Sequence, residues 1–510
     1  MFSSIHSAEI SGIECQKVSV EADVGDGLPN FVMVGYLSSQ VREAGERVKT
    51  ALKNSDIHLY PKKVTINLSP ADLRKSGTVF DLPIALAILS AYGKLKLEQC
   101  EHFMIIGELG LDGSVRAVKG VLPIVRYAAR SGYRYCIVPK ENAHEGAIVE
   151  GISVIGVESL LQTIDFLQGA INIEETVTDL ERHNMQSHSD EGEDFANIRG
   201  QGAVKRAAEV AAAGMHNLLL IGGPGSAKSM TARAIAGILP ELSLAEILEI
   251  SEIYSISGAL SSEMPFIKKR PFRAPHHTAT AVSLVGGGQI PHAGEISLAH
   301  RGILFLDELP EFRKSVLEML RQPLEDKEVN IHRRNQNYRF PSNCMLVAAM
   351  NPCRCGYYPD EKRCTCTWSE IQSYLGKVSG PFLDRMDLNV EANRVVYEDL
   401  VAEQAEESTA VIRERITKAL MIQKERYKKQ GFYFNSELDI EGIKTYCVLG
   451  KGESKLMEQA YEKLQMSARG YHRTLRVART IADLEAEERI QCHHIAEAIC
   501  YRSVERKYWQ

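Results

Sequence analysis

Hydrophobic and polar positions alternate with two different periods along the first third of the chain. Short apolar runs such as KVTINL, FMIIGEL and YCIVP have the length and composition of β-strands. REAGERVKTALKN, FDLPIALAILSAYG and VLPIVRYAARSG instead repeat apolar residues at helical spacing. This alternation predicts an α/β domain over residues 1–170. The polar, acidic stretch over residues 171–194 predicts a solvated linker, with a surface helix as the alternative.

Strands and helices alternate again over residues 195–393, and a different pattern follows. Residues 394–510 contain two long stretches of helical periodicity, LVAEQAEESTAVIRERITKALMIQKERYKKQG and LRVARTIADLEAEERIQCHHIAEAICYRSVERKY. We therefore expect a second α/β domain with a parallel sheet, followed by a helical domain.

Composition sets bounds on this picture. The 510 residues, 44% hydrophobic and 25% charged, are typical of a globular protein with several cores. The longest apolar run, LPIALAILSAYG, is too short to span a bilayer, and the N-terminus shows no secretory signal. With 11 cysteines and no such signal, we expect a cytoplasmic protein without membrane contact or a disulfide framework. The net charge of −6 means that any affinity for nucleic acid must come from local basic clusters.

The segment NLLLIGGPGSAKSMTARAIAGIL predicts a nucleotide site. An apolar strand leads into GGPGSAKS and a helix follows from Lys228, so backbone N–H groups and the helix N-terminus can hold phosphate oxygens. Lys228 would bridge the β- and γ-phosphates, and Ser229 would ligate Mg²⁺. Ala227 stands where the pattern has glycine, and its methyl group is tolerable if its φ angle is negative. The loop residues predicted to bind nucleotide are Gly222, Gly223, Pro224, Gly225, Ser226, Ala227, Lys228, Ser229 and Met230.

Two further strands end in polar residues. Asp307 and Glu308 follow the apolar run Ile303–Leu306, at the strand end where open α/β sheets bind ligands. Asp307 would hold Mg²⁺ through water, and Glu308 would orient and polarise the attacking water. The strand CMLVAAMN ends in Asn351, whose amide can position that water or touch the γ-phosphate.

Two arginine-containing stretches add positive charge. In SGPFLDRMDL, no local carboxylate claims Arg385 except Asp384 and Asp387, and its guanidinium can stabilise charge that develops on the γ-phosphate. In SARGYHRTLRVAR, four arginines lie close together on a predicted helix, and most of them are expected on a solvated basic face. They are Arg469, Arg473, Arg476 and Arg479.

In this order, the motifs resemble those of AAA+ ATPases. RPFRAPHHT, GEISLAHRGILFLDELPEF, SGPFLDRMDL and ARTIADL are similar, more narrowly, to the magnesium-chelatase-like ComM/YifB family over nearly the whole chain. MCM helicases of the same clade also resemble this phosphate loop in carrying AKS, so the resemblance implies that the loop works.

The resemblance also implies roles for further residues. Arg385 would be an arginine finger that reaches a neighbour's ATP, and Arg469, with Arg473 as second choice, would be the second sensor. A finger that acts between subunits implies a ring, which the family suggests is a hexamer. The family is associated with DNA branch migration and helicase activity during recombination of incoming DNA. The adenine pocket would be lined by IRGQ through Ile198, Gly200 and Gln201.

Two insertions interrupt the ATPase core. VNIHRRNQNYRFPSN has two β-like arms and resembles the presensor-1 hairpin, so Arg333, Arg334 and Arg339 are predicted to contact DNA phosphates. The alternative is a hairpin packed on the next subunit with its arginines paired. The second insertion contains Gly286–Gly288 and suggests a mobile hairpin or loop.

NPCRCGYYPDEKRCTC contains two C-x-C pairs. Four thiolates suit tetrahedral Zn²⁺ and leave no open position, so we expect a structural zinc knuckle, with four reduced thiols as the alternative. The four residues are Cys353, Cys355, Cys364 and Cys366. We interpret His276 and His277 in APHHT as loop or subunit-contact residues rather than metal ligands.

The first domain, with GELGLDGSVRAVKGVLPIVRYAARSGYRYCIVP and NLSPADLRKSGTVFDLPIALAIL, resembles the ribosomal S5-like fold of Lon proteases and RadA. Lon-type proteolysis needs a serine activated by a lysine. Those positions fall near Phe80–Asp81 and Leu122, while Ser76, Lys75 and Lys119 are out of register. We therefore expect a non-proteolytic domain.

Together these patterns predict a ring-forming, Mg²⁺-dependent ATPase that moves DNA, with ATP, Mg²⁺ and structural Zn²⁺ as its cofactors. Two alternatives stay open at this point. One is a chelatase-like motor that remodels a protein partner, and the other is a nucleotide-switched scaffold that binds ATP without turnover.

Overall fold

The computed structural model divides the chain into two compact units. It describes residues 1–96, 100–178, 193–333, 336–395, 397, 406–428 and 430–509. Arg334 and most of the expected linker, residues 179–192, lie outside them. The first unit comprises Met1–Ser187, Leu244–Lys268 and Asn330–Phe340; the second comprises His188–Ser243, Lys269–Val329 and Pro341–Gln510. Because the units interleave along the chain, the boundaries of the expected consecutive domains remain a prediction.

The first unit contains the α/β layers that the hydrophobic pattern predicts. One sheet has the strand order β1-β2-β4-β3 and another the order β5-β8-β9. Helix α2 (Asp81–Ala91) is buried along its whole length because apolar residues occupy nearly every position. The strands are β1 (Phe2–Ser11), β2 (Glu14–Gly25), β3 (Asn30–Val34), β4 (Lys63–Ser69), β5 (Phe103–Ile105), β6 (Glu108–Leu109), β7 (Val115–Arg116), β8 (Tyr135–Pro139) and β9 (Ser153–Val157). The other helices are α1 (Ser39–Asn54), α3 (Val121–Arg130), α4 (Ala143–Gly146), α5 (Leu160–Leu167) and α8 (Leu244–Ser257).

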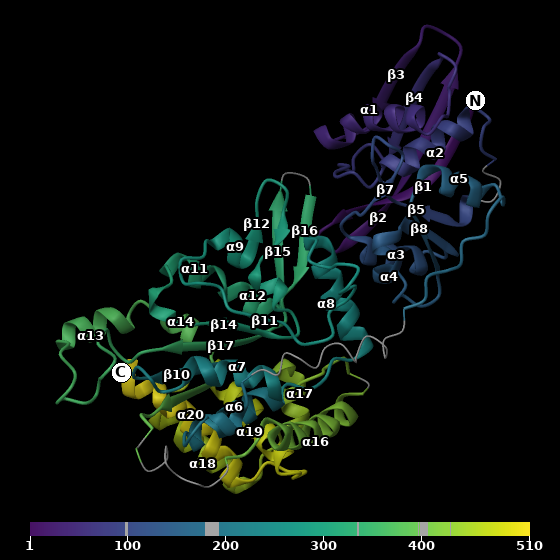
Figure 1. Cartoon of the computed structure of the whole chain (residues 1–510). Helices are drawn as coiled ribbons and strands as arrows, with labels where there is room; N and C mark the ends of the chain where they lie inside the picture. Colours follow the sequence, from purple (N-terminus) through teal and green to yellow (C-terminus); the bar gives the residue numbers. More distant parts are fainter. Residues whose placement is uncertain are drawn as a thin grey trace. The chain divides into compact units, whose positions relative to one another are not determined.

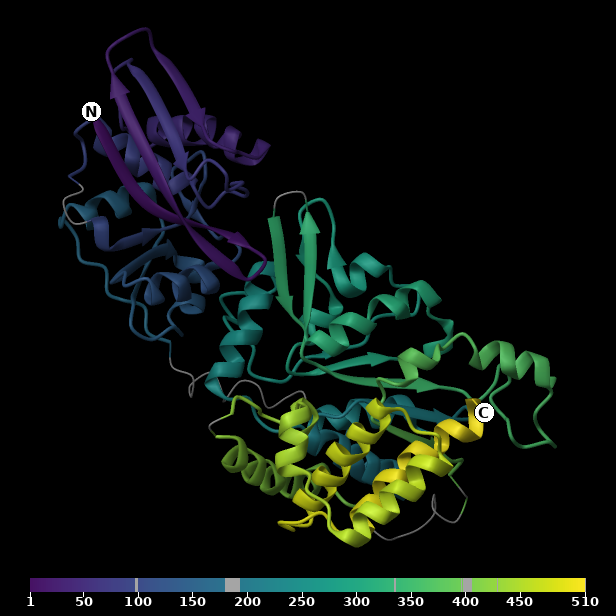
Figure 2. The same cartoon turned by 180° about the vertical axis from the view of Figure 1, so that it is seen from behind.

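The second unit is built on a parallel sheet with the order β11-β14-β17-β10-β18, which confirms the expected fold class. Its strands are apolar because helices cover both faces, with α9, α11 and α12 on one side and α6, α19 and α20 on the other (Figure 1 and Figure 2). The strands are β10 (Leu218–Gly222), β11 (Phe272–Arg273), β14 (Ile303–Leu306), β17 (Met345–Met350) and β18 (Leu388–Ala392). The helices of this part of the unit are α6 (Gly202–Gly214), α7 (Lys228–Ile238), α9 (Ala281–Val285), α10 (Glu295–Leu298), α11 (Lys314–Met319), α12 (Arg321–Asp326), α13 (Trp368–Leu375) and α14 (Gly380–Leu383).

Strand register brings the predicted nucleotide motifs to one edge of this sheet. Ile221 lies beside Met350, and Leu306 lies beside Ala348, in parallel pairing. The carboxyl ends of β10, β14 and β17 therefore emerge together, where such sheets bind ligands. Hairpins occur at both insertions, as β12 (Gly286–Gly287) with β13 (His292–Ala293) and β15 (Glu328–Arg333) with β16 (Gln336–Pro341).

The C-terminal block is helical, but its second long stretch is not one helix. It forms α19 (Ala468–Leu484) and α20 (Cys492–Trp509), because Ala486 has a φ of 56° and the N–H of Glu487 donates to the carbonyl of Ala482. Such a left-handed residue closes a helix, a feature that the 3.6-residue periodicity does not reveal. The other helices are α16 (Thr409–Tyr427), α17 (Ile440–Tyr446) and α18 (Lys451–Lys463). Among the described residues, no helix combines the length and apolar composition needed to cross a membrane.

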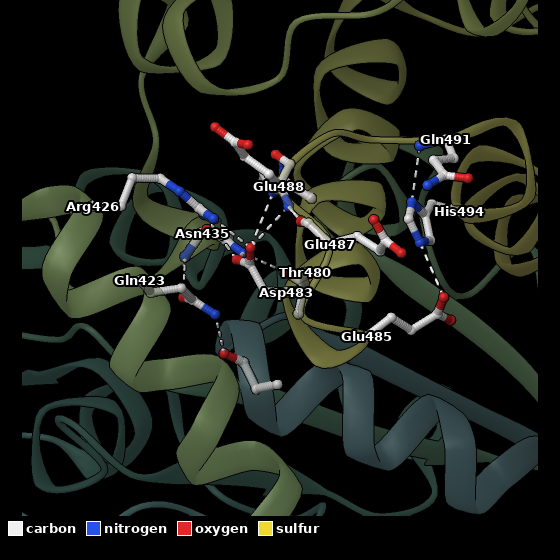
Figure 3. A network of polar contacts seen from close by, with 12 residues as sticks. Gln423, Arg426, Asn435, Thr480, Asp483, Glu485, Glu487, Glu488, Gln491 and His494 are labelled. Carbon is white, nitrogen blue, oxygen red and sulfur yellow. Dashed lines mark hydrogen bonds and ion pairs between the residues drawn. The ribbon is translucent and has the colours of Figure 1, made fainter.

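A buried polar network joins these helices (Figure 3). Asp483 of α19 accepts hydrogen bonds from Arg426 of α16, at 2.9 Å, and from Asn435, at 2.8 Å. Gln423 of α16 donates to the carbonyl of Ala213 in α6, at 2.9 Å. Because a buried carboxylate is tolerated only when it is paired, these contacts fix how the helices pack behind the sheet.

Candidate nucleotide site

Lys228 begins α7 directly after the turn that follows β10. Its Nζ donates to the carbonyl oxygens of Gly222, at 2.8 Å, and Gly223, at 2.9 Å, and to Oδ1 of Asn351, at 3.2 Å. Burial lowers the pKa of Lys228, and the nearby Asp307 partly offsets that effect. Phosphate oxygens would compete well for this ammonium group because hydrogen bonds between charged partners are stronger than those to neutral carbonyls.

Ala227 does not have the negative φ angle that would make its methyl group easy to tolerate. Its φ of 56° and ψ of 22° place it in the left-handed region. For a residue with a Cβ this conformation costs about 1–2 kcal/mol. Gln201 and Glu308, two further predicted site residues, also have positive φ angles of 59° and 52°. Three predicted site residues thus have a backbone conformation of the kind that often occurs at functional sites.

The two predicted Mg²⁺ ligands are adjacent. Ser229 Oγ donates to Asp307 Oδ2 at 2.7 Å, which joins the first turn of α7 to the end of β14. Hydroxyl and carboxylate oxygens are ligands that Mg²⁺ accepts together with phosphate oxygens, so these residues fit the ion.

Glu308 has a partner that the sequence did not reveal. Its Oε2 lies 3.3 Å from Nδ1 of His277, a residue interpreted above as a loop or subunit contact. The pairing arises because β11 runs parallel to β14, with Arg273 beside Leu304, so the residues after both strands meet. With only two residues in β11, the sequence gives little signal for this neighbour.

Arg385 and Arg469 share one carboxylate. Arg385 Nη2 lies 2.6 Å from Glu325 Oε2, and Arg469 Nη2 lies 2.6 Å from Glu325 Oε1. Arg385 also donates to the carbonyls of Arg321, at 2.9 Å, and Pro381, at 2.6 Å, and only 6% of it is exposed. The carboxylate that binds Arg385 is therefore not a local one, because Glu325 lies 60 residues away along the chain. In this structure its own chain holds the guanidinium.

The other helical arginines are less accessible than expected. Arg473 lies 3.5 Å from Asp387 and its side chain is 15% exposed, whereas that of Arg469 is 57% exposed. Arg479 is buried and lies 3.0 Å from Asp483, and Arg476 donates to the carbonyl of Leu438. The prediction that most of these arginines form a solvated basic face is therefore wrong, because their helix packs into the core of the second unit.

The IRGQ residues lie beside the segment that follows β18. Ile198 is buried, the N–H of Gly200 donates to Glu406 Oε1 at 2.8 Å, and Gln201 Nε2 donates to the carbonyl of Asn393. Their contact with adenine remains a prediction.

The four cysteines of the C-x-C pairs form one cluster. The Sγ atoms of Cys353 and Cys355 are 3.3 Å apart, and that of Cys364 lies 3.8 Å and 3.6 Å from them. Together with the Sγ atom of Cys366, these make four sulfurs that all lie within 4.8 Å of one another. A Zn²⁺ ion with Zn–S bonds of about 2.3 Å needs sulfurs about 3.8 Å apart, so the cluster fits a closed tetrahedral site.

Arg333 and Arg339, two of the three arginines predicted to contact DNA, lie on the β15–β16 hairpin. The side chains of Arg333 and Arg339 are exposed, and Arg334 lies outside the described residues. Within the first unit, the carbonyl of Arg339 accepts a hydrogen bond from the N–H of Ile13, at 3.2 Å. Their binding to DNA remains a prediction.

Asp81, near the position of the Lon nucleophile, and the out-of-register residues Ser76 and Lys75 all contact other groups. Arg47 Nε lies 2.7 Å from Asp81 Oδ2, and Ser76 Oγ donates to Glu9 Oε1 at 2.6 Å. The Nζ of buried Lys75 donates to the carbonyl of Pro70. Burial raises the pKa of Glu9 to about 7. These contacts leave Ser76 and Lys75 engaged with partners other than each other.

Most of the chain matches known protein families and relatives. Three family models match: magnesium chelatase subunit ChlI over residues 194–400, subunit ChlI of Mg-chelatase over 20–142, and the ChlI C-terminal model over 406–502. Competence protein ComM of Haemophilus influenzae is 41% identical over 506 residues, covering 98% of this chain and 97% of ComM. An archaeal Lon protease of Methanocaldococcus jannaschii is 34% identical over 112 residues, or 22% of this chain and 17% of the protease. DNA repair protein RadA of Listeria monocytogenes is 29% identical over 115 residues, or 22% of this chain and 23% of RadA.

Proposed function

The chain belongs to the magnesium-chelatase-like family that includes ComM and YifB, and on that premise we propose that it is a ring-forming ATPase whose hydrolysis of ATP moves DNA. The family is one of AAA+ ATPases, so ATP and Mg²⁺ are the cofactors that it implies.

The hydrolysis proposal rests on one observation. Lys228, Ser229, Asp307 and Asn351 converge at the carboxyl edge of the parallel sheet, with contacts of 2.7 Å to 3.2 Å between them. Mg²⁺ bound with ATP would be held by Ser229 and Asp307 and would neutralise charge on the phosphate oxygens. Glu308 would take a proton from the attacking water, and Asn351 would orient that water.

The assembly proposal rests on the pair of arginines at Glu325. Because Arg385 and Arg469 bind the same carboxylate, they lie close enough to act on one ATP. We propose that they leave Glu325 for the phosphates held by a neighbouring chain, where a guanidinium would stabilise charge in the transition state. This requires a ring of identical chains, and the resemblance to the family suggests that the ring is a hexamer.

The DNA proposal is supported by relatives and by exposed charge. ComM is named a competence protein and RadA a DNA repair protein. Arg333 and Arg339 are exposed on a hairpin and could bind phosphates without regard to base sequence. We further propose that the N-terminal domain is non-proteolytic and that the four cysteines hold structural Zn²⁺.

The test is the rate of ATP hydrolysis with no DNA and with single-stranded, duplex or branched DNA. We expect DNA to raise the rate, and Arg333→Ala to weaken that response and reduce its dependence on salt. Equal rates with and without every DNA would contradict the DNA motor and favour a motor that acts on a protein. Glu308→Gln should bind ATP and not hydrolyse it. If the unaltered chain also binds ATP without hydrolysing it, that result would favour a nucleotide-switched scaffold.

A further inference from the structure

The four-cysteine loop lies directly against the phosphate loop. Gly356, which follows Cys355, has a φ of 85°, and a Cβ there would be only 2.6 Å from Cδ and 3.0 Å from Cγ of Pro224. In the reverse direction, a Cβ on Gly223 would be 3.0 Å from the carbonyl oxygen of Gly356. A Cβ at Gly356 would therefore press against the side-chain ring of Pro224, and one at Gly223 would crowd the carbonyl oxygen of Gly356, so the two loops pack closely here.

The turn at Gly356 is fixed by the cysteine cluster. The N–H of Gly356 donates to the carbonyl of Cys353 at 3.0 Å, and the N–H of Tyr358 donates to Cys353 Sγ at 3.4 Å. A closed metal site would hold the four sulfurs, and hence this turn, in one arrangement, since metal binding contributes directly to local folding. Without metal, nothing covalent would join the two C-x-C pairs across the loop.

The contact is close to the groups that would hold phosphate. Lys228 Nζ donates to the carbonyl of Gly223, the residue that touches Gly356. The cysteine loop also begins two residues after Asn351, whose Oδ1 accepts from the same lysine. A shift of the turn at Gly356 would therefore move the phosphate loop and the end of β17 together.

We propose that the four-cysteine loop supports the phosphate loop. Affinity for ATP then depends on Zn²⁺, although the zinc site itself does not contact the nucleotide. This proposal rests on the nucleotide site of the proposed function. It assigns Gly356 as a positioning residue, which acts on ATP through Gly223 and Pro224.

The first test compares zinc-loaded and zinc-free full-length protein in binding a fluorescent ATP analogue, with Zn²⁺ content measured for each sample. We expect chelation of Zn²⁺, or Cys353→Ser, to weaken binding by about tenfold or more, the loss expected for one misplaced charge-assisted hydrogen bond. Cys500→Ser is the matched control, since Cys500 is an exposed cysteine outside the cluster. It should change neither the Zn²⁺ content nor the affinity.

The second test changes the contact and leaves the cysteines intact. Gly356→Ala should keep its Zn²⁺ and still bind the analogue about tenfold more weakly. Gly431→Ala is the control, because Gly431 has a similar φ of 76° but no atom within 4 Å of the new Cβ. Adding Pro224→Ala removes Cγ and Cδ, so Gly356→Ala/Pro224→Ala should bind as tightly as Pro224→Ala alone.

Each outcome decides the proposal. If the unaltered protein binds no nucleotide, the proposed function fails. If it binds, and both zinc-free protein and Gly356→Ala bind equally well, the support role is overturned. A weakened Gly356→Ala that Pro224→Ala does not rescue also overturns it. Circular dichroism checks that each variant folds, and if Gly356→Ala does not, the zinc-free comparison decides.

Discussion

Replacing Glu325 by glutamine should free Arg385 and Arg469, the two arginines proposed to bind the ATP of a neighbouring chain. The carboxylate of Glu325 binds Arg385 and Arg469 at 2.6 Å each, and an amide of the same size would bind at most one of them, without charge. Glu325 is 46% exposed and Arg469 more so, so solvent screens this half of the cluster. An exposed ion pair contributes about 0.2–1 kcal/mol. With the buried Arg385 included, the free energy by which Glu325 restrains both arginines is about 1–2 kcal/mol.

This energy sets the size of the expected effect. A restraint weaker by about 1–2 kcal/mol makes the released arginines roughly 5–30 times more populated. If ATP hydrolysis requires their release on assembly, the protein concentration that gives half-maximal ATPase activity should fall by a similar factor.

The assay is ATPase activity per chain across a dilution series, with assembly followed by light scattering. Glu425→Gln is a matched control, because Glu425 of α16 forms an exposed ion pair with Lys428, at 3.3 Å. It should leave the concentration dependence unchanged. If Glu325→Gln assembles normally and hydrolyses ATP more slowly at every concentration, Glu325 positions the arginines and does not restrain them, which excludes the proposed release.

Other consequences of the structure can be measured separately. Ala227→Gly relieves a left-handed alanine, so the free energy of unfolding in denaturant should rise by up to about 1 kcal/mol with ATPase activity retained; a clear loss of stability would contradict this. The pKa of Glu9 is raised from 4.5 to about 7, so its stabilising contribution is complete below pH 4.5 and is lost as the pH rises to about 7. Glu9→Gln should therefore stabilise the protein by up to about 3 kcal/mol at pH 8 and have little effect at pH 4, whereas equal thermal shifts at both pH values would exclude this origin. Elemental analysis should find about one Zn²⁺ per chain, lost in Cys353→Ser and in Cys364→Ser. Folded, metal-free wild-type protein would remove the zinc proposal.

The parts of the site that lie at strand ends could be predicted from the sequence. Apolar runs before Gly222, Asp307 and Asn351 indicate buried parallel strands, and parallel strands bring their carboxyl ends to one edge. The cysteine cluster could also be predicted, because its four residues lie within one short loop. In each case a local pattern carries the information.

The contacts that restrain these groups could not be predicted. Glu325 and Arg385 are 60 residues apart, and nothing in LEDKE distinguishes a carboxylate that binds two arginines from one that faces solvent. His277 reaches Glu308 only because β11 pairs with β14. Gly356 looks like an ordinary turn glycine until its approach to Pro224 is seen. These contacts depend on how segments distant in the sequence pack against one another, which local periodicity does not encode.

In the proposed ring, one chain holds ATP and the adjacent chain supplies Arg385. Mixing Lys228→Ala chains with Arg385→Ala chains tests this arrangement, because each variant lacks what the other provides. We expect each alone to be inactive and an equal mixture to recover about a quarter of the wild-type ATPase rate, the share of junctions that combine an intact phosphate loop with an intact arginine. Full activity of Arg385→Ala alone, or a co-assembled mixture that remains inactive, would contradict the account.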